Sequence, residues 1–198
     1  MDADTREALK QRILLARAED QTAGLFCESA FVGMCELLGR ELAESVRAST
    51  WPMRQWVSFF RYPVADLLRM VDAAADLGSN QGGLSYAQAL QRIGERMTRY
   101  VQESPLSRAY RLAAGNNPHD RLALSIKSSQ LVSTYGERKY ERVSPTRVHL
   151  LFRYELLGPS WIMGSYMATA RSISSVRMTV SLEEFQEPGL DFQLLCSW

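Results

Sequence analysis

The sequence predicts an α+β fold in which an N-terminal helical layer packs on a C-terminal four-stranded antiparallel sheet, with the sheet part in the order strand–strand–helix–strand–strand. Apolar residues recur at helical spacing through the first two-thirds of the chain. Beyond about residue 122 the period changes to the alternation of half-buried strands. The last nine residues, 190–198, alternate apolar and polar side chains up to Trp198. We therefore expect the C-terminus to be a strand docked in the sheet.

The chain has the size and composition of one globular domain. Its 198 residues can bury a sizeable core, and the 46% hydrophobic content excludes wholesale disorder. We expect a single domain over residues 1–198. Within it, 1–20 form an arm or a short helix, 21–117 the helical part and 122–198 the sheet part.

Charge and cysteine content exclude several classes of protein. Lys and Arg number 23 against 22 Asp and Glu, a net charge of +1 that gives no sign of nucleic-acid binding. Cys27, Cys35 and Cys196 are odd in number and form no CxxC pair, so we interpret them as buried hydrophobes in a reducing cytoplasm. The polar N-terminus is no secretory signal, and no apolar run reaches the roughly 18–20 residues of a membrane span. We expect a cytoplasmic protein.

The first half of the chain reads as a series of helices. The capping-box pattern of residues 4–7 favours a short helix at the start. The apolar stretch from Phe26 to Leu38 predicts a buried helix that continues, with a break at Gly39, to Ala48. Trp51-Pro52 marks a boundary, because proline disfavours helix in the residue before it.

Three further helices are expected before the sheet. Pro63 lies in the first turn of an amphipathic helix with apolar residues at i, i+3, i+4 and i+7. Residues 78–83 are rich in glycine and predict a loop. Ser85 with Gln88 forms a capping box for the next helix, and Ser104-Pro105 begins another that ends at residues 115–118.

The remaining elements form the sheet. Residues 132–143 and 148–154 predict a hairpin across the turn 144–147. A helix follows from Gly158-Pro159 to about residue 172. Residues 176–180 then form the third strand and 190–198 the fourth.

Short blocks dispersed along the chain carry a family resemblance: Gly24-Leu25-Phe26, Phe59-Phe60-Arg61-Tyr62-Pro63-Val64, Tyr135-Gly136-Glu137-Arg138, Leu190-Asp191-Phe192 and Ser197-Trp198. In these residues the chain resembles a myxobacterial paralogous family of unknown function. The order of elements also resembles a superfold shared by haem-based nitric-oxide-sensing domains, vinyl-reductase-type ligand-binding domains and vesicle-tethering TRAPP subunits. The resemblance implies a domain that holds a small molecule or uses its surface for assembly.

The haem-binding relatives use a histidine on the helix before the sheet and a Tyr-x-Ser-x-Arg motif, and neither is found here. The matching segment, 106–112, contains no histidine, although Tyr110 is of a type that ligates ferric iron. His119 falls in a proline-flanked loop and His149 in a strand. We therefore predict no cofactor, with haem in particular disfavoured.

Catalytic patterns are also missing. The chain contains no HExxH, CxxC or Gly-x-Ser-x-Gly pattern, and residues 78–83 lack the Lys-Ser/Thr of a phosphate-binding loop. We predict no catalytic residues and no metal ligands.

Two sets of residues are candidates for binding. An apolar cavity between helices and sheet would be lined by large apolar side chains, most of which also suit an ordinary core: Phe31, Met34, Trp56, Tyr62, Tyr110 and Phe152. Basic residues around the first hairpin suit either a solvated strand face or a docking surface for an acidic partner: Lys127, Arg138, Lys139, Arg142 and Arg147.

These observations favour a non-enzymatic binding or regulatory module that acts through a protein partner, a second copy of itself or a small apolar ligand. A haem-based or other cofactor-based sensor is the second hypothesis. An enzyme whose site is assembled from dispersed residues is the third.

Overall fold

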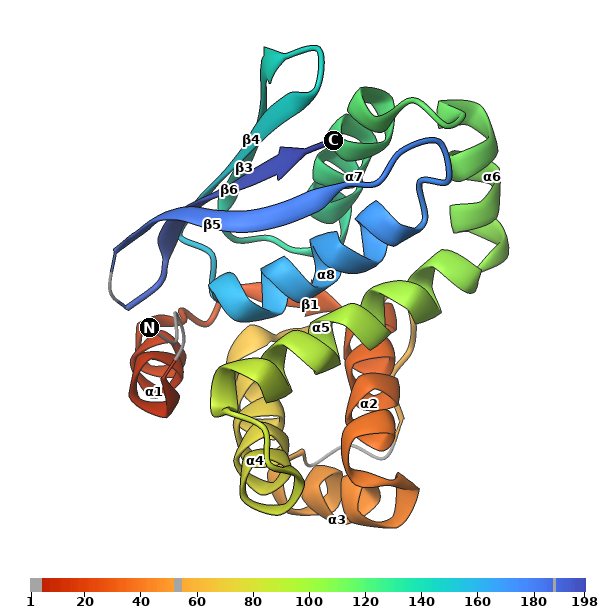
Figure 1. Cartoon of the computed structure of the whole chain (residues 1–198). Helices are drawn as coiled ribbons and strands as arrows, with labels where there is room; N and C mark the ends of the chain where they lie inside the picture. Colours follow the sequence, from red (N-terminus) through yellow and green to blue (C-terminus); the bar gives the residue numbers. More distant parts are fainter. Residues whose placement is uncertain (1–4, 52–54, 187) are drawn as a thin grey trace.

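The computed structural model describes residues 5–51, 55–186 and 188–198, and Figure 1 shows the whole chain. The elements are α1 (Arg6–Leu15), β1 (Gln21–Ala23), α2 (Gly24–Leu38), α3 (Arg40–Thr50), β2 (Arg61–Pro63), α4 (Val64–Gly82), α5 (Tyr86–Glu103), α6 (Pro105–Ala114), α7 (Pro118–Val132), β3 (Glu137–Ser144), β4 (Arg147–Arg153), α8 (Pro159–Arg171), β5 (Thr179–Gln186) and β6 (Asp191–Ser197). The predicted α+β class and the predicted order of strands around one helix are confirmed.

The four-stranded sheet is antiparallel throughout, with the spatial order β3-β4-β6-β5. Its buried face carries the apolar residues of the central strands. Phe152 on β4 pairs with Phe192 on β6, and their rings stack with centroids 4.8 Å apart. The helices α7 and α8 lie along this face, and α2 to α5 form the layer beyond α8 (Figure 1).

Two glycines set how closely α5 and α8 approach each other. A Cβ atom on Gly94 of α5 would collide with the backbone oxygen of Trp161, and one on Gly164 of α8 would collide with the backbone of Gln91. Glycine therefore lets the two backbones touch, which brings Leu90 and Ile93 into the core beside the fully buried Trp161.

A second, two-stranded sheet connects the helical layer with the end of α7. Strands β1 and β2 pair antiparallel, and Thr22 of β1 also bridges to Ser133 just after α7. The amide of Thr134 donates to the carbonyl of Gln21 at 2.9 Å. The sequence pattern did not indicate these short strands, because three residues are too few to show a period.

Residues 78–83 differ from the loop predicted for them. The helix α4 continues through this segment to Gly82, and only Gly83 takes a left-handed conformation, at φ 63°. Gly78 packs against the side chain of Leu37 of α2, where a Cβ atom would be crowded. This glycine therefore serves close helix packing, a tertiary contact that outweighs its low helix propensity.

The helix α7 was missed, and the first strand begins later than predicted. Asn117 caps α7 by accepting from the amide of His119 at 2.9 Å, and Pro118 is its first residue. The same residues were interpreted only as the end of the preceding helix. Strand β3 therefore starts at Glu137 instead of residue 132, and β5 spans 179–186 instead of 176–180.

A buried ion pair joins β3 to the segment after β4. Arg138 Nε donates to Glu155 Oε2 at 2.6 Å, and the two side chains are 4% and 0% exposed. Burial acts to lower the pKa of Arg138, but the charge of Glu155 and its hydrogen bond outweigh burial and raise it. Arg138 also donates to Ser133 Oγ and the Ser129 carbonyl, so this pair fastens the last turn of α7 to the sheet.

The C-terminus is docked as expected, although Trp198 itself is only half-buried and lies outside β6. Its ring packs edge-on against His119, with centroids 4.8 Å apart. Since the carbonyl of Pro145 can only accept, His119 Nε2 donates to it at 2.8 Å. His119 Nδ1 then accepts from the Tyr140 hydroxyl at 2.5 Å. These contacts fasten the first turn of α7 to the hairpin.

The substitution Glu155→Gln should destabilise the fold by about 3–5 kcal/mol, because it leaves Arg138 as an uncompensated buried charge. Urea unfolding measures this loss. The matched control is Glu183→Gln, which removes an exposed carboxylate 3.1 Å from His149 and should cost under about 1 kcal/mol. Equal losses in the two variants would contradict the importance of the buried pair.

The substitution Trp198→Ala should lower the melting temperature by about 2–8 °C, which corresponds to about 1–2 kcal/mol for a half-buried aromatic ring. Deleting residues 194–198 should prevent folding, because it also removes the fully buried Leu194 and Cys196. Circular dichroism during heating checks both. A truncated chain that melts like the full chain would refute this placement of β6.

Candidate ligand-binding site

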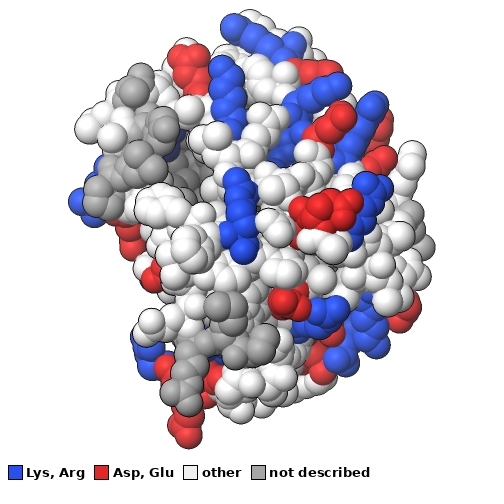
Figure 2. All heavy atoms as spheres, turned by 180° about the vertical axis from the view of Figure 1, so that it is seen from behind, with Lys and Arg blue, Asp and Glu red and all other residues white. Residues whose placement is uncertain are grey.

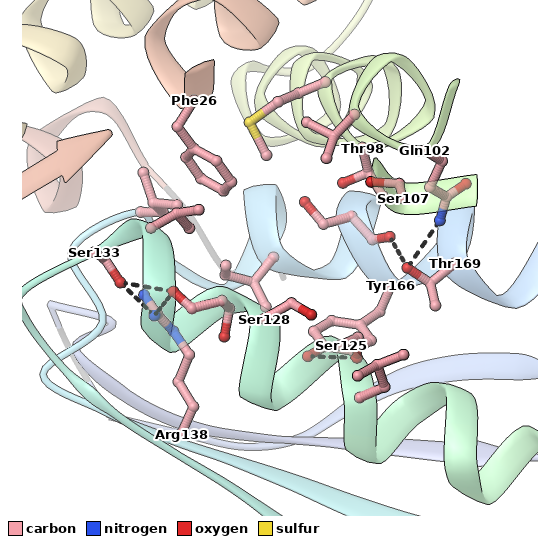
Figure 3. Close-up of a pocket in the computed structure, with 18 of the residues that line it drawn as sticks. Phe26, Thr98, Gln102, Ser107, Ser125, Ser128, Ser133, Arg138, Tyr166 and Thr169 are labelled. Carbon is pink, nitrogen blue, oxygen red and sulfur yellow. Dashed lines mark hydrogen bonds between the residues drawn. The ribbon is translucent and has the colours of Figure 1, made fainter. Parts of the chain in front are cut away.

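A cavity of about 220 Å³ lies where α7, α8 and the C-terminal half of α5 meet the sheet (Figure 3). Most of its surface is apolar. The apolar lining comes from α2, α5, α7, β4, the segment after β4 and α8: Leu25, Phe26, Met97, Val101, Leu124, Val132, Phe152, Leu157 and Ile162. Ligand pockets commonly measure roughly 300–1,000 Å³, so this one suits a small ligand or part of a larger one.

Hydroxyl groups line the wall that α7 contributes, at Ser125, Ser128 and Ser129, with Ser133 just beyond the helix. Several of them donate back to the helix: Ser125 to the Leu122 carbonyl at 2.7 Å, and Ser129 to the Ile126 carbonyl at 2.7 Å. Their donors are thereby used within the protein. These hydroxyl oxygens are polar groups in a cavity wall that is mostly apolar.

Arginines stand at the two ends of the α7 wall and differ in their partners. Near the C-terminal end, Arg138 is neutralised by Glu155. Near the N-terminal end, Arg121 is 7% exposed and donates to the Ser172 hydroxyl at 2.8 Å. Burial, together with the positive charge of Arg111 from α6, lowers the pKa of Arg121. The arginine at the C-terminal end of α7 is therefore neutralised by a carboxylate, whereas the N-terminal end carries two neighbouring positive charges.

Tyr166 and Met97 are the lining side chains with metal-binding chemistry. Tyr166 is buried, its ring packs edge-on against Phe152, and its hydroxyl is 3.3 Å from Ser125 Oγ. Burial raises the pKa of Tyr166, so the phenol is neutral at ordinary pH. Met97 is 2% exposed and contributes its thioether. In the described part of the chain, no group of three or more His, Cys, Asp or Glu is placed to hold a metal ion.

Of the six residues predicted to line a ligand cavity, Phe152 does so. Tyr110 lies on α6, but its side chain is outside the described part of the structure. Phe31, Trp56 and Tyr62 belong to a separate aromatic cluster with Trp51, in which neighbouring ring centroids are 5.5–6.0 Å apart. Arg47 stacks on Phe31 and Trp56. Met34 is fully buried in the core.

The residues that the sequence reading missed come mainly from α7 and the polar face of α5. Arg121, Ser125 and Ser129 are spaced four residues apart, which places them on one helical face. That spacing is visible in the sequence, but only after the helix itself has been recognised. The signal for the helix was Asn117-Pro118, which serves as its cap and first residue.

The basic set predicted around the hairpin is divided by the fold. Lys127, Lys139, Arg142 and Arg147 are exposed, and their role in partner binding stays a prediction. Arg138 differs from the expected surface position because it is buried against Glu155.

On the face that Figure 2 shows, basic and acidic side chains are interspersed. No helix within residues 5–51, 55–186 and 188–198 is long and apolar enough to cross a bilayer.

The fold is similar to those of H-NOX domains of known structure. The Fe(II) unliganded H-NOX protein from K. algicida is 13% identical with a TM-score of 0.66, covering 88% of this chain and 95% of that one. A structure from work on haem redox potential and protein-induced porphyrin distortion is 12% identical with a TM-score of 0.68, covering 89% and 99%. An oxygen-binding H-NOX domain related to soluble guanylate cyclases, in its oxygen complex, is 9% identical with a TM-score of 0.65, covering 88% and 94%.

These neighbours contradict the prediction of no cofactor with haem disfavoured, because haem, Fe(II) and oxygen are named for them. That prediction rested on a missing histidine and a missing motif. The fold nevertheless provides an apolar cavity with arginines and a phenol in its walls, which the motif search did not detect.

No curated protein sequence matches the chain. The resemblance to a family of unknown function is confirmed. The family model DUF2378, described as a protein of unknown function, matches residues 16–198, and the chain therefore belongs to this family.

Proposed function

We propose that this chain is a sensor domain that binds a small, mostly apolar cofactor or ligand in the pocket beneath α7. The observation that carries the proposal is the pocket itself, an apolar cavity with polar groups along one wall. The chain also shares its fold, over 88–89% of its length, with an Fe(II) H-NOX protein and with a structure from work on haem redox potential. This similarity favours the second hypothesis from the sequence, a cofactor-based sensor, over the first.

Haem is the first cofactor to test, and the pocket matches it in chemistry but not in size. Phe26, Phe152 and Ile162 offer apolar contacts to a porphyrin, and Arg111 and Arg121 offer positive charge to its carboxylates. Met97 and Tyr166 belong to residue types that ligate haem iron. When bound, haem would supply an iron centre for a diatomic gas. Because the cavity measures only about 220 Å³, haem would require a wider pocket than this structure has.

A bound ligand can act on the surface through the end of α7. The pocket residues Val132 and Ser133 are tied to β1, since Thr22 Oγ1 donates to the Val132 carbonyl at 3.3 Å. At the preceding residue, Arg61 of β2 donates to the Leu131 carbonyl at 2.8 Å. A shift of α7 therefore moves β1 and β2 directly.

The turn before β2 is a surface suited to a protein partner. Phe59 and Phe60 are 90% and 63% exposed, and large exposed aromatic side chains mark interaction sites. The amide of Gly24 at the start of α2 donates to the Phe60 carbonyl at 2.8 Å, so this turn also contacts the helix that brings Phe26 to the pocket. The partner that we propose is a second copy of the chain.

Native mass spectrometry of protein expressed with ample haem precursor should detect a non-covalent ligand, and visible absorption should report whether it is haem. Leu124→Trp, which fills the cavity, should abolish binding. The control is Leu131→Trp, the same change at an exposed position of the same helix. If haem is bound, Tyr166→Phe or Met97→Leu should alter its spectrum, whereas Met34→Leu, outside the pocket, should not. Protein that carries no ligand and takes up no added haem would refute the sensor proposal.

The double substitution Phe59→Ser and Phe60→Ser should abolish self-association at micromolar concentrations, because the dimer would lose its apolar contact. Sedimentation velocity measures this, and an unchanged melting temperature would show that the fold is intact. The matched control is Leu112→Ser, at a position 84% exposed on α6. Dimerisation that survives the double change would place the interface elsewhere.

A further inference from the structure

The chemical class of the pocket ligand can be inferred from the charges at the N-terminal end of α7. Arg121 is almost fully buried, and Arg111 from the facing helix α6 is close enough to lower its pKa. Both side chains line the cavity. Because Arg121 is almost fully buried, a second positive charge beside it is costly unless an anion joins the two.

No described residue supplies that anion. Neither arginine forms an ion pair with a carboxylate within residues 5–51, 55–186 and 188–198, and the recorded hydrogen bond of Arg121 goes to the neutral hydroxyl of Ser172. At the other end of the same helix, Arg138 has its own carboxylate, Glu155, at 2.6 Å. Within the described residues, one pocket arginine is thus paired with a carboxylate of the protein. The other two, Arg111 and Arg121, can pair with the anionic group of a ligand.

The shape of the cavity suits a molecule with one charged end. Its α7 wall extends from Arg121 to Val132, the last residue of the helix, which is about 16 Å along the helix axis. Its volume of about 220 Å³ equals that of roughly seven water molecules. Away from the two arginines, the walls carry Phe26, Val132 and Phe152. A short hydrocarbon chain fills such a space, and its charged end would lie against α6.

We propose that the pocket binds a small apolar carboxylic acid whose carboxylate lies between Arg111 and Arg121 and whose hydrocarbon body contacts the apolar walls. This inference rests on the proposed function and specifies the ligand of the same site. A carboxylate can come from an alkyl acid or from the propionates of haem. The shared chemistry is a carboxylate attached to an apolar body.

The test compares octanoate with 1-octanol, which has the same chain and no charge, by isothermal titration calorimetry on the full chain. Octanoate should bind at least about tenfold more tightly than octanol. Arg121→Gln and Arg111→Gln should each weaken octanoate by about tenfold or more and leave octanol unchanged. Arg108→Gln, an exposed arginine one turn from Arg111, is the matched control and should change neither.

The melting temperature of the ligand-free variants separates ligand binding from a structural role. Because Arg121→Gln removes an uncompensated charge, the free protein should melt at the same temperature or higher, while its stabilisation by octanoate should be lost. If Arg121→Gln does not fold, Arg111→Gln provides the test, because Arg111 is only half-buried.

The two proposals fail in different ways. Equal binding of octanoate and octanol, or wild-type affinity in both arginine variants, would overturn the carboxylate assignment and leave the sensor proposal standing. If only haem binds, its affinity is compared with that of its dimethyl ester. A loss on esterification and in the arginine variants supports the carboxylate site with haem as its source, and no loss overturns it. If none of these molecules binds, the carboxylate assignment is refuted, and the sensor proposal is refuted with it when native mass spectrometry also detects no other ligand.

Discussion

The buried ion pair between Arg138 and Glu155 is the interaction on which the pocket depends. It is formed between β3 and the segment after β4, and from there Arg138 reaches Ser133 Oγ at 2.6 Å and the Ser129 carbonyl at 3.2 Å. Those two groups belong to the last turn of α7 and the residue after it. A guanidinium with several fixed donors is suited to this task, since one side chain can satisfy a carboxylate and a helix end together.

The other end of α7 is held by hydrogen bonds and a ring contact of His119. His119 lies between the Tyr140 hydroxyl, the Pro145 carbonyl and the ring of Trp198. A helix fastened at both ends cannot collapse onto the layer beneath it, and the small serine side chains in its middle do not fill the gap. The cavity therefore follows from the attachment of α7 and from the size of its residues. The close packing of α5 on α8 at Gly94 and Gly164 keeps the opposite wall in place.

What the sequence could predict depended on the range of the interactions involved. The strand pattern of 148–154, the capping box at Ser85 and the helix break at Gly39 are local, and the structure contains all three. The helical state of Gly78 depends on Leu37 of another helix, and the burial of Arg138 depends on a carboxylate 17 residues away. No periodicity reports such contacts. Most of the residues that line the pocket were missed for the same reason, because the pocket exists only where five helices and the sheet meet.

In the proposed binding mode, the different charges at the two ends of α7 would also determine which way the ligand lies. A carboxylate gains little from Arg138, because Glu155 already neutralises its charge and its Nε and Nη1 atoms donate to Glu155, Ser133 and the Ser129 carbonyl. We expect the carboxylate to gain most between Arg111 and Arg121. The hydrocarbon end of the ligand then points toward Phe26 and Val132, next to the residues that join α7 to β1. In this orientation the arginines would bind the carboxylate at the N-terminal end of α7. The length of the hydrocarbon would then determine how far the ligand displaces the side chains at the C-terminal end of α7. A sensor built in this way discriminates among acids by the size of the apolar body, at the end of α7 that is connected to the exposed turn before β2.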